Sequence, residues 1–476
     1  MVKNSATDIL SQLYTARPPN FVQLLYLCGM VSFGDTIFAP ATSVGTGAIS
    51  VIRVSGSGAL AAVDSIVRFR HGSASGSDGY RILFGDIPGV DEVLVSVFKA
   101  PHSYTGEDGA EISCHSSSYI VSEILSLLSQ AGCRPALPGE FTQRAYLNGK
   151  MDLAQAEAVA DIISSDSSAS HRLALSQLKG AYSNGLRGLR DSLVELAALL
   201  ELELDFSEEE VEFADRSKLC ALLDSAAEKV DRLKASYRVG NAVKNGVPVA
   251  IVGAPNSGKS TLLNRLLGED RAIVSPVPGT TRDTVEETLV LDGVRYRFID
   301  TAGLHESEDF VENLGMERSI EKLRSAAIVI LLLDSTASGS SAILEKVCGE
   351  IAPEQKLLVF SNKADLSSGF WADELCCASI SALTGEGMDL LYKAISDCGF
   401  ASVGDTSTVT SARHFSALSD ASASLAQVRN ALDLGLSGEL VAEDLRNAIS
   451  SLGSIFGEVA SDEVLGSIFS QFCIGK

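Results

Sequence analysis

Apolar and polar positions follow three different patterns along this chain, and each pattern predicts a different architecture. Between Asp35 and about Asn148, apolar residues alternate with polar ones or run over strand lengths, as in Ala48–Val54 and Glu92–Phe98, with glycine-rich turns between them. Tyr119–Ala131 instead has apolar residues at helical spacing. The first region therefore predicts a small α+β domain.

The second pattern predicts helices. Over residues 149–245, apolar positions recur mostly every three or four residues and few side chains are β-branched, which is typical of long amphipathic helices. The acidic cluster Glu201–Glu212 fits a solvated helix end or loop. Helical spacing returns over residues 404–476. We expect the two stretches to pack together as one discontinuous helical domain.

The third pattern, over residues 246–403, alternates apolar strands with helical segments. The four apolar runs are Val249–Val252, Tyr296–Ile299, Ala327–Leu333 and Leu357–Phe360. Such runs, separated by helices, indicate a mainly parallel sheet covered on both faces. We therefore predict an α/β multidomain protein in which a Ras-like P-loop domain is inserted into the helical domain. An N-terminal domain (residues 31–148) precedes them, after an extension (residues 1–30) that we expect to be poorly ordered.

Composition narrows the function classes. The 476 residues include 38 Lys and Arg against 61 Asp and Glu, a net charge of −23. This balance argues against a large non-specific basic surface for nucleic acid. The nine cysteines form no CxxC pair, which predicts reduced thiols and a cytoplasmic location. The apolar stretch Phe21–Phe33 is interrupted by polar and small residues and therefore fits an upstream extension better than a signal peptide.

A phosphate-binding motif stands at the start of the inserted domain. Gly253–Ser260 fits the pattern GxxxxGK[ST] and follows the predicted strand Val249–Val252. In such a loop the backbone N–H groups surround the phosphates, Lys259 reaches the β- and γ-phosphates, and Ser260 coordinates Mg²⁺. The alternative, a structural glycine-rich turn, would not require the lysine and serine.

Further motifs in the expected order indicate guanine. Asp300–Gly303 ends an apolar strand, and Thr281 lies between it and the P-loop. The Asp365 carboxylate in Asn362–Asp365 can accept two hydrogen bonds from guanine, a pattern that adenine does not supply. A backbone amide of Ser381–Leu383 would meet guanine O6. The predicted GTP-binding residues are Asn256, Ser257, Gly258, Lys259, Ser260, Thr261, Ser275, Pro276, Val277, Pro278, Gly279, Thr280, Thr281, Asp300, Thr301, Ala302, Gly303, Asn362, Lys363, Asp365, Ser381, Ala382 and Leu383.

The hydrolytic residues are less usual. Leu304 occupies the position where Ras-like enzymes have a water-orienting glutamine. The acidic loop Glu306–Glu312 is the available replacement, and Arg282 is the nearest candidate for an arginine finger. Oxygen atoms of Asn256 and of Ser275–Thr280 could instead hold a monovalent cation, which would offset transition-state charge.

Nearly the whole chain after Met30 resembles one family, the MnmE (TrmE) tRNA modification GTPases. Four stretches carry the resemblance: Asp35–Ala39 with Ile52–Gly56, the segment Pro138–Ala158, the G motifs including Gly279–Asp283, and the terminal Cys473–Lys476. The second and fourth stretches are specific to this family. An Era- or EngA-like ribosome-assembly switch is the alternative, although no GXXG in a basic context, as a KH-like RNA module would have, follows the G motifs. A folate-sensing protein without turnover is a third possibility.

The resemblance implies ligands and partners. It implies potassium-stimulated GTP hydrolysis with an FAD-dependent MnmG/GidA-type partner in a heterotetramer. The product would be an aminomethyl- or carboxymethylaminomethyl-type group at C5 of a tRNA wobble uridine. A homodimer is implied, with tRNA held mostly by the partner. The implied residues are Asn256, Ser275, Val277 and Thr280 for K⁺, Ser260 and Thr281 for Mg²⁺, Glu312, Lys259 and Asp300 for catalysis, and Arg53, Glu111, Lys150 and Lys476 for a 5-formyltetrahydrofolate-type folate.

Two stretches depart from the family pattern. Ser43–Ala48 lacks the arginine of the usual Gly-Arg-Gly-Gly loop, and Cys114–Ser118 replaces a His-Gly-Gly stretch. Both lie in the N-terminal domain, so we expect them to affect folate binding. Cys473 could be a nucleophile, but it has no activating neighbour in the sequence, and a buried thiol is its expected state.

Overall fold

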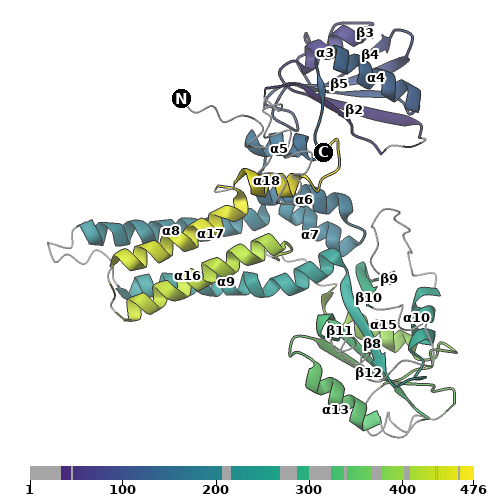
Figure 1. Cartoon of the computed structure of the whole chain (residues 1–476), viewed down its shortest axis with the longest axis vertical. Helices are drawn as coiled ribbons and strands as arrows, with labels where there is room; N and C mark the ends of the chain where they lie inside the picture. The colour runs from purple at the N-terminus through teal and green to yellow at the C-terminus, as the bar shows by residue number, and fades with distance from the viewer. Residues whose placement is uncertain are drawn as a thin grey trace, which may run out of the picture. The chain divides into compact units, whose positions relative to one another are not determined.

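The computed structural model describes the chain as two compact units (Figure 1). One unit contains the described residues up to Glu157 together with Gly457–Lys476, and the other spans Ala158–Phe456. The boundary falls inside helix α6 (Leu153–Ser164). The described residues are 34–43, 45, 47–205, 216–268, 287–299, 323–336, 340–366, 378–400, 408–434, 436, 438–458 and 461–476. The predicted extension, residues 1–30, lies outside them, and the predicted domain boundaries stay a prediction.

The N-terminal unit is built on a seven-stranded sheet with the order β3-β4-β5-β6-β2-β1-β7. Its strands are β1 (Ile37–Pro40), β2 (Ile49–Ser55), β3 (Arg68–Phe69), β4 (Arg81–Ile87), β5 (Asp91–Phe98), β6 (Gly109–His115) and β7 (Arg134–Pro135). Neighbours pair antiparallel except β1 with β7. Its helices are α3 (Ala59–Ile66), α4 (Ser118–Gln130), α5 (Glu140–Leu147) and α18 (Asp462–Phe469). The predicted strands and helix of this region are confirmed to within a residue at each end.

Strand alternation explains how this sheet forms a core. Along β5, Val93, Val95 and Val97 are buried and belong to the cluster that includes Ile124 and Leu128 of α4. The residues between them face the other way, because successive side chains of a strand point to opposite faces. The apolar face of β5 is therefore the face that packs against α4.

A network of ion pairs holds α5 in this unit. Arg134 donates to Asp35 at 2.8 Å and to Glu140 at 2.6 Å, and Arg144 donates to Glu140 at 3.0 Å and to Glu107 at 3.2 Å. Glu140 and Arg144 are almost fully buried. Burial alone would raise the pKa of Glu140, but hydrogen bonds and charge from the two arginines hold it below its ordinary value. The family-like segment around α5 therefore has a structural role.

The second unit begins with helices. They are α7 (Ser168–Leu178), α8 (Ala181–Asp205), α9 (Arg216–Asn245), α16 (Ala412–Asp433) and α17 (Gly438–Phe456). Helix α17 packs against α8 and α16, and α16 packs against α9, as Figure 1 shows. The buried leucines recur at helical spacing, as in Leu186 and Leu193 of α8 and Leu445 and Leu452 of α17. Helices from before and after the inserted region therefore share one bundle.

The inserted region forms a six-stranded sheet with the order β13-β12-β11-β8-β10-β9. Its strands are β8 (Val247–Gly253), β9 (Glu287–Leu291), β10 (Val294–Phe298), β11 (Ile328–Asp334), β12 (Lys356–Asn362) and β13 (Ala378–Ser379). Only β9 pairs antiparallel among these described strands. The helices are α10 (Lys259–Gly268), α13 (Ser340–Glu350) and α15 (Met388–Ser396). Consecutive residues Leu331 and Leu332 are both fully buried and belong to different clusters, so both faces are covered. The predicted α/β multidomain class is confirmed.

The length and the hydropathy of a helix decide whether it can cross a membrane. Within the described part of the chain, none of the helices combines the length and the apolar character needed to cross a membrane.

Candidate nucleotide-binding site

The predicted phosphate loop joins β8 to α10, and two of its residues have positive φ. Asn256 has φ +60° and Gly258 has φ +96°. A Cβ atom on Gly258 would lie 2.2 Å from Asn362 Nδ2, and one on Gly253 would lie 2.3 Å from the Leu332 carbonyl oxygen. Close packing therefore requires both glycines, and the backbone conformation at Gly258 requires a glycine as well.

Lys259 is the first residue of α10, and its ammonium turns back into the loop. Its Nζ donates to the carbonyl oxygens of Gly253 at 3.1 Å and Ala254 at 2.8 Å. Burial lowers the pKa of this lysine because desolvation disfavours the charged form. The ammonium and the N-terminus of α10 thus lie in the same turn, an arrangement that favours an anion.

Asn362 connects three motifs that are far apart in the sequence. It is buried at the end of β12, where its Nδ2 donates to the Ser257 carbonyl at 2.8 Å. Its Oδ1 accepts from the Ala382 backbone N–H at 2.9 Å. The phosphate loop, the Asn362–Asp365 motif and the Ser381–Leu383 motif therefore lie together, and one of the three amides of the last motif, that of Ala382, is bonded to Asn362.

Lys363 is held by a carboxylate that sequence reasoning missed. Lys363 has φ +67°, and its Nζ donates to Asp334 Oδ2 at 2.6 Å. Burial alone would raise the pKa of Asp334, but hydrogen bonds from Lys363 and Thr336 hold it below its ordinary value. The sequence showed only that Asp334 follows the apolar run Ala327–Leu333. The structure shows that β11 pairs in parallel with β12, which places Asp334 beside Asn362 in the register.

The carboxylate of Asp365, predicted to recognise the base, is exposed and held by a hydrogen bond. Asp365 Oδ1 accepts from the buried Ser381 hydroxyl at 2.6 Å. The guanidinium of Arg265, on α10, donates to the carbonyl oxygens of Ala382, at 2.6 Å, and Leu383. Arg265 is a second residue that sequence reasoning missed, because nothing in its spacing places it against this loop. The arrangement leaves the Asp365 carboxylate at the surface, where it can accept from a planar base.

The remaining predicted residues fall into two groups. Ser260 and Thr261 lie in the first turn of α10, and the exposed Asn256 lies in the loop. The second group has predicted switch, Mg²⁺, K⁺ or catalytic roles and lies outside the described residues. Its members are Ser275, Pro276, Val277, Pro278, Gly279, Thr280, Thr281, Asp300, Thr301, Ala302, Gly303 and Glu312.

A second candidate site lies in the N-terminal unit. Arg53 on β2 and Glu111 on β6 are cross-strand partners, joined by hydrogen bonds of 2.8 and 3.0 Å. Arg53 Nη1 also donates to the Gly475 carbonyl at 3.3 Å, and the guanidinium lies 5.2 Å from the ring centroid of Tyr104. Arg53, Glu111 and Tyr104 line a cavity of about 70 Å³. The structure therefore brings two of the four predicted folate residues together.

The other two predicted folate residues have different surroundings. Lys150 is exposed and donates to the Pro101 carbonyl at 2.9 Å. Lys476 is half-buried, next to Gly475, where a Cβ atom would lie 2.2 Å from the Pro40 carbonyl. The prediction that Cys473 is buried is wrong: its side chain is exposed. In this tail Phe472 and Gly475 are the residues that turn inward.

The two departures from the family pattern lie against each other. The Ser116 hydroxyl donates to the Gly45 carbonyl at 3.2 Å, and the Ser116 amide donates to the Ala48 carbonyl at 3.2 Å. Ser116, in the segment that replaces His-Gly-Gly, thus contacts the loop that lacks the arginine. Their spacing of about 70 residues hid this contact in the sequence.

The fold and the site together define a P-loop protein with the motifs of guanine recognition. Two family models match: "GTP-binding protein TrmE N-terminus" over residues 36–150 and "MnmE helical domain" over residues 153–473. The chain belongs to the MnmE family, and with it to the GTP hydrolases, as the sequence predicted. This membership decides against the Era- or EngA-like alternative.

Relatives match along almost their whole length. A protein of Bacteroides thetaiotaomicron is 47% identical over 467 residues, covering 93% of this chain and 99% of the relative. One of Porphyromonas gingivalis is 47% identical over 469 residues, covering 93% and 98%. Both are named tRNA modification GTPase MnmE. The G domain of the FeoB iron transporter of T. maritima is 25% identical over 32% of this chain and 98% of that one, with a TM-score of 0.24, too low to support an argument.

Proposed function

We propose that this chain is a tRNA modification GTPase. With an FAD-dependent MnmG-type partner it would install an aminomethyl- or carboxymethylaminomethyl-type group at C5 of the wobble uridine of certain tRNAs. The observation that carries the GTPase part is Asn362, which bonds the phosphate loop at 2.8 Å and the Ser381–Leu383 motif at 2.9 Å. The tRNA part is supported by the family and by the names of its members.

The described side chains supply the binding steps of GTP turnover. Lys259 and the N–H groups at the start of α10 hold the phosphates, and Asp365, fixed by Ser381, accepts from the base. The Ser260 hydroxyl, half-buried in the first turn of α10, is the hard oxygen donor that suits Mg²⁺. Bound Mg²⁺ would neutralise charge on the phosphates.

A monovalent cation and a water-orienting carboxylate complete the proposal. The exposed amide of Asn256 presents an oxygen of the kind that K⁺ prefers, in a loop position with φ +60°. Ser275, Val277 and Thr280 are the other proposed K⁺ ligands, Thr281 is the second Mg²⁺ ligand, and Asp300 and Glu312 act in hydrolysis. Hydrolysis at equal rates in sodium and potassium would contradict the cation proposal.

Association with a second copy is supported by the uncovered face of the N-terminal sheet. Ile82 is 68% exposed on β4 and Leu94 is 48% exposed on β5, where it pairs with Phe84. Neighbouring apolar side chains of this kind mark interaction surfaces in soluble proteins. We propose a homodimer through this unit, with tRNA contacts supplied mostly by the MnmG-type partner, as the net charge of −23 suggests.

The N-terminal unit is the proposed site for a 5-formyltetrahydrofolate-type donor. The Glu111 carboxylate can accept from the amino-amide edge of a pterin, and Arg53, Lys150 and Lys476 can pair with the carboxylates of its glutamate tail. The Arg53–Glu111 contact supports this proposal because it places opposite charges at one small cavity.

The test is mass analysis of wobble nucleosides in cells that lack this chain. We expect the C5-modified uridines to disappear and to return when the intact chain is supplied. Cells given the Asp365→Asn chain should remain deficient, because that variant favours xanthine over guanine nucleotides. Unchanged wobble uridines in the cells lacking the chain would refute the tRNA function while leaving the GTPase site intact.

A further inference from the structure

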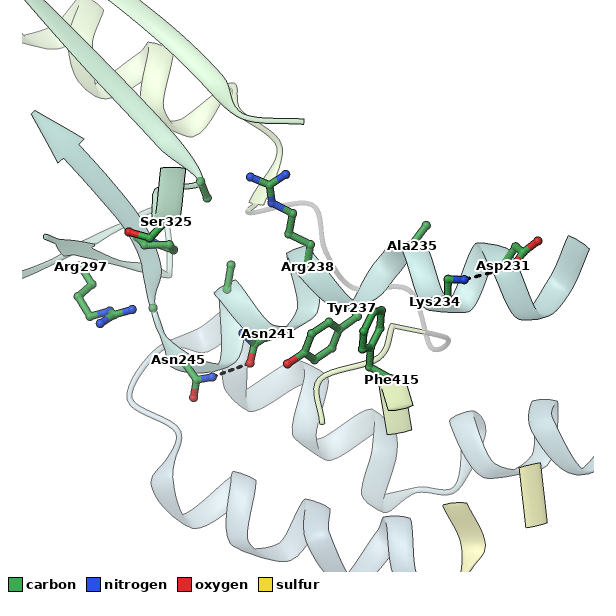
Figure 2. A pocket seen from close by; sticks show the side chains of 14 residues that line it. Asp231, Lys234, Ala235, Tyr237, Arg238, Asn241, Asn245, Arg297, Ser325 and Phe415 are labelled. Atoms are coloured by element: carbon green, nitrogen blue, oxygen red, sulfur yellow. Dashed lines mark hydrogen bonds and ion pairs between the residues drawn. The ribbon is translucent and has the colours of Figure 1, made fainter. Parts of the chain in front are cut away.

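One pocket of the second unit is separate from the nucleotide site. It has a volume of about 790 Å³ and lies within the second unit, where residues of α9, α16, β8 and β10 line it (Figure 2). Gly246 and Pro248, at the start of β8, line it, whereas the phosphate loop begins at Gly253, where β8 ends. A strand of this length spans about 20 Å. The pocket and the GTP site therefore lie at opposite ends of strand β8.

The walls of this pocket are held together by a shared core. Ala242 and Val243 near the end of α9 belong to the same buried cluster as Val247 and Val249 of β8. The helix and the sheet edge are thus packed on each other at the pocket. A volume of this size is in the range of sites that hold small organic ligands.

The pocket is cationic in a strongly acidic protein. Lys234, Arg238 and Arg297 line it, against the single carboxylate of Asp231. Two of the ion pairs here are weak: Lys234 Nζ lies 3.9 Å from Asp231 Oδ1, and the Arg238 pair with Glu354, at 3.1 Å, has both side chains more than 40% exposed. Exposed pairs of this kind contribute little, so a phosphate can replace the carboxylates as partner.

The remaining polar lining suits a planar, hydrogen-bonding ring. Tyr237, Asn241 and Asn245 are four residues apart and share one face of α9, as Figure 2 shows. Asn245 Nδ2 donates to Asn241 Oδ1 at 2.7 Å, which orients the two amides and leaves further donor and acceptor atoms. The ring of Tyr237 is stacked on Phe415 of α16, with centroids 4.6 Å apart. A nucleotide can use all three kinds of group: amides bind the edge of its base, aromatic side chains contact the base, and cations bind its phosphate.

We propose that this pocket binds a nucleotide, with its phosphate on Lys234, Arg238 and Arg297 and its base beside Tyr237, Asn241 and Asn245. The nucleotide is either a free mononucleotide or one residue of an RNA strand. This site is additional to the GTP site and does not depend on the proposed function.

Binding to the full-length protein tests the proposal. The probes are AMP and UMP, which lack the guanine edge that Asp365 would read, and a single-stranded RNA tetramer, measured by calorimetry or fluorescence anisotropy at low salt with GDP bound. We expect the Lys234→Glu/Arg238→Glu variant to bind at least about tenfold more weakly, because two charge-assisted contacts are reversed. The matched control is Arg232→Glu, on α9 outside this pocket, where Arg232 is 71% exposed and pairs with Glu228.

The binding results either support or overturn the proposal. Pocket-dependent binding of mononucleotides supports a free nucleotide as the occupant, and pocket-dependent binding of the tetramer alone supports an RNA strand. No binding of either probe, an unchanged affinity in the double variant, or an equal loss in the Arg232→Glu control overturns the proposal. Unchanged GDP affinity in all variants shows that they are folded. As a second variant, Asn241→Leu removes an amide without changing charge and should weaken binding by about threefold to tenfold.

Discussion

The phosphate loop and the Arg53 site differ in the sequence separation of the contacts that build them. Lys259 bonds to carbonyl groups five and six residues before it. Arg53 bonds to Glu111, 58 residues away, and to Gly475, 422 residues away. The first site is therefore set by a local loop, and the second exists only after the sheet and the C-terminal tail have come together.

The difference also lies in the chemical groups used. The phosphate loop consists mainly of backbone groups and depends on glycines that leave room for them. The N-terminal unit relies on charged side chains that neutralise one another, from the partly buried Arg53–Glu111 pair to the buried Glu140 network. Substitutions should therefore act on affinity in the first site and on stability in the second.

The largest expected effect is in the buried network of the N-terminal unit. Glu140→Ala leaves Arg134 and Arg144 without this carboxylate and should cost about 3–5 kcal/mol of stability. Hydrogen exchange of the α5 amides measures the loss. The matched control is Glu92→Ala, because the Glu92–Arg70 pair is 63% exposed on both sides and should contribute about 1 kcal/mol or less. Similar losses in the two variants would contradict the assignment.

The lowered pKa of Glu140 predicts how the stability of the N-terminal unit depends on pH. The folded-state pKa of Glu140 is lowered, so its contribution is present above its ordinary pKa of 4.5 and is lost as the pH falls through the folded value. Protection of α5 should therefore fall in acid. As the pH is lowered below 4.5, Glu140→Gln should show a smaller loss of protection than the unchanged protein. An identical pH profile in both would remove Glu140 as the cause.

The next effect tests the backbone character of the phosphate loop. Gly258→Ala places a Cβ atom 2.2 Å from Asn362 Nδ2 at φ +96° and should lower GTP affinity by about a hundredfold. Gly268→Ala is the control, because a Cβ atom there has no neighbour within 4 Å. Fluorescent GDP binding measures both. If the two variants bind equally well, the loop does not depend on close packing with Asn362.

A smaller effect concerns the side-chain part of the nucleotide site. Asp334→Asn removes the negative partner of Lys363 and should weaken GTP binding by about tenfold, since a charge-assisted hydrogen bond contributes about 1.5–3 kcal/mol before compensation. Asp420→Asn, at an exposed position of α16, is the control. Equal affinities would show that Lys363 is held in place by its backbone alone.

The smallest effect is expected at the partly buried contacts of the N-terminal unit. Arg53→Lys loses the two-nitrogen contact with Glu111 and the bond to Gly475, and should cost about 1 kcal/mol. Hydrogen exchange of β2 and of the C-terminal residues reports the change. Arg68→Lys, at an exposed position on β3, should have almost no effect. A loss confined to β2, with an unchanged tail, would mean that the Gly475 contact is unimportant.

Several features followed from the sequence because they depend on local patterns. Alternating apolar residues predicted β2 and β5 to within a residue, and helical spacing predicted α4. The motif Gly253–Ser260 predicted a strand, a loop and a helix in that order, as β8 and α10 confirm. In each case neighbouring residues determine the backbone conformation.

Other features needed the tertiary structure because they join distant segments. Asp334 meets Lys363 only because β11 and β12 pair in register, and Arg265 reaches the Ser381–Leu383 loop from another element. Periodicity does not encode such pairings. The exposure of Cys473, which we expected to be buried, was likewise seen only in the folded chain.

The sequence by itself determined the order of the elements, the phosphate loop and the family, because these reside in short patterns that neighbouring residues enforce. Only the tertiary structure decided which charges meet. It joined Arg53 to the C-terminal tail and buried Glu140 between two arginines. It also formed a cationic pocket at the end of α9 in a chain whose net charge is −23. Net charge is a sum over the chain, whereas binding depends on the few groups that folding brings within reach of one ligand.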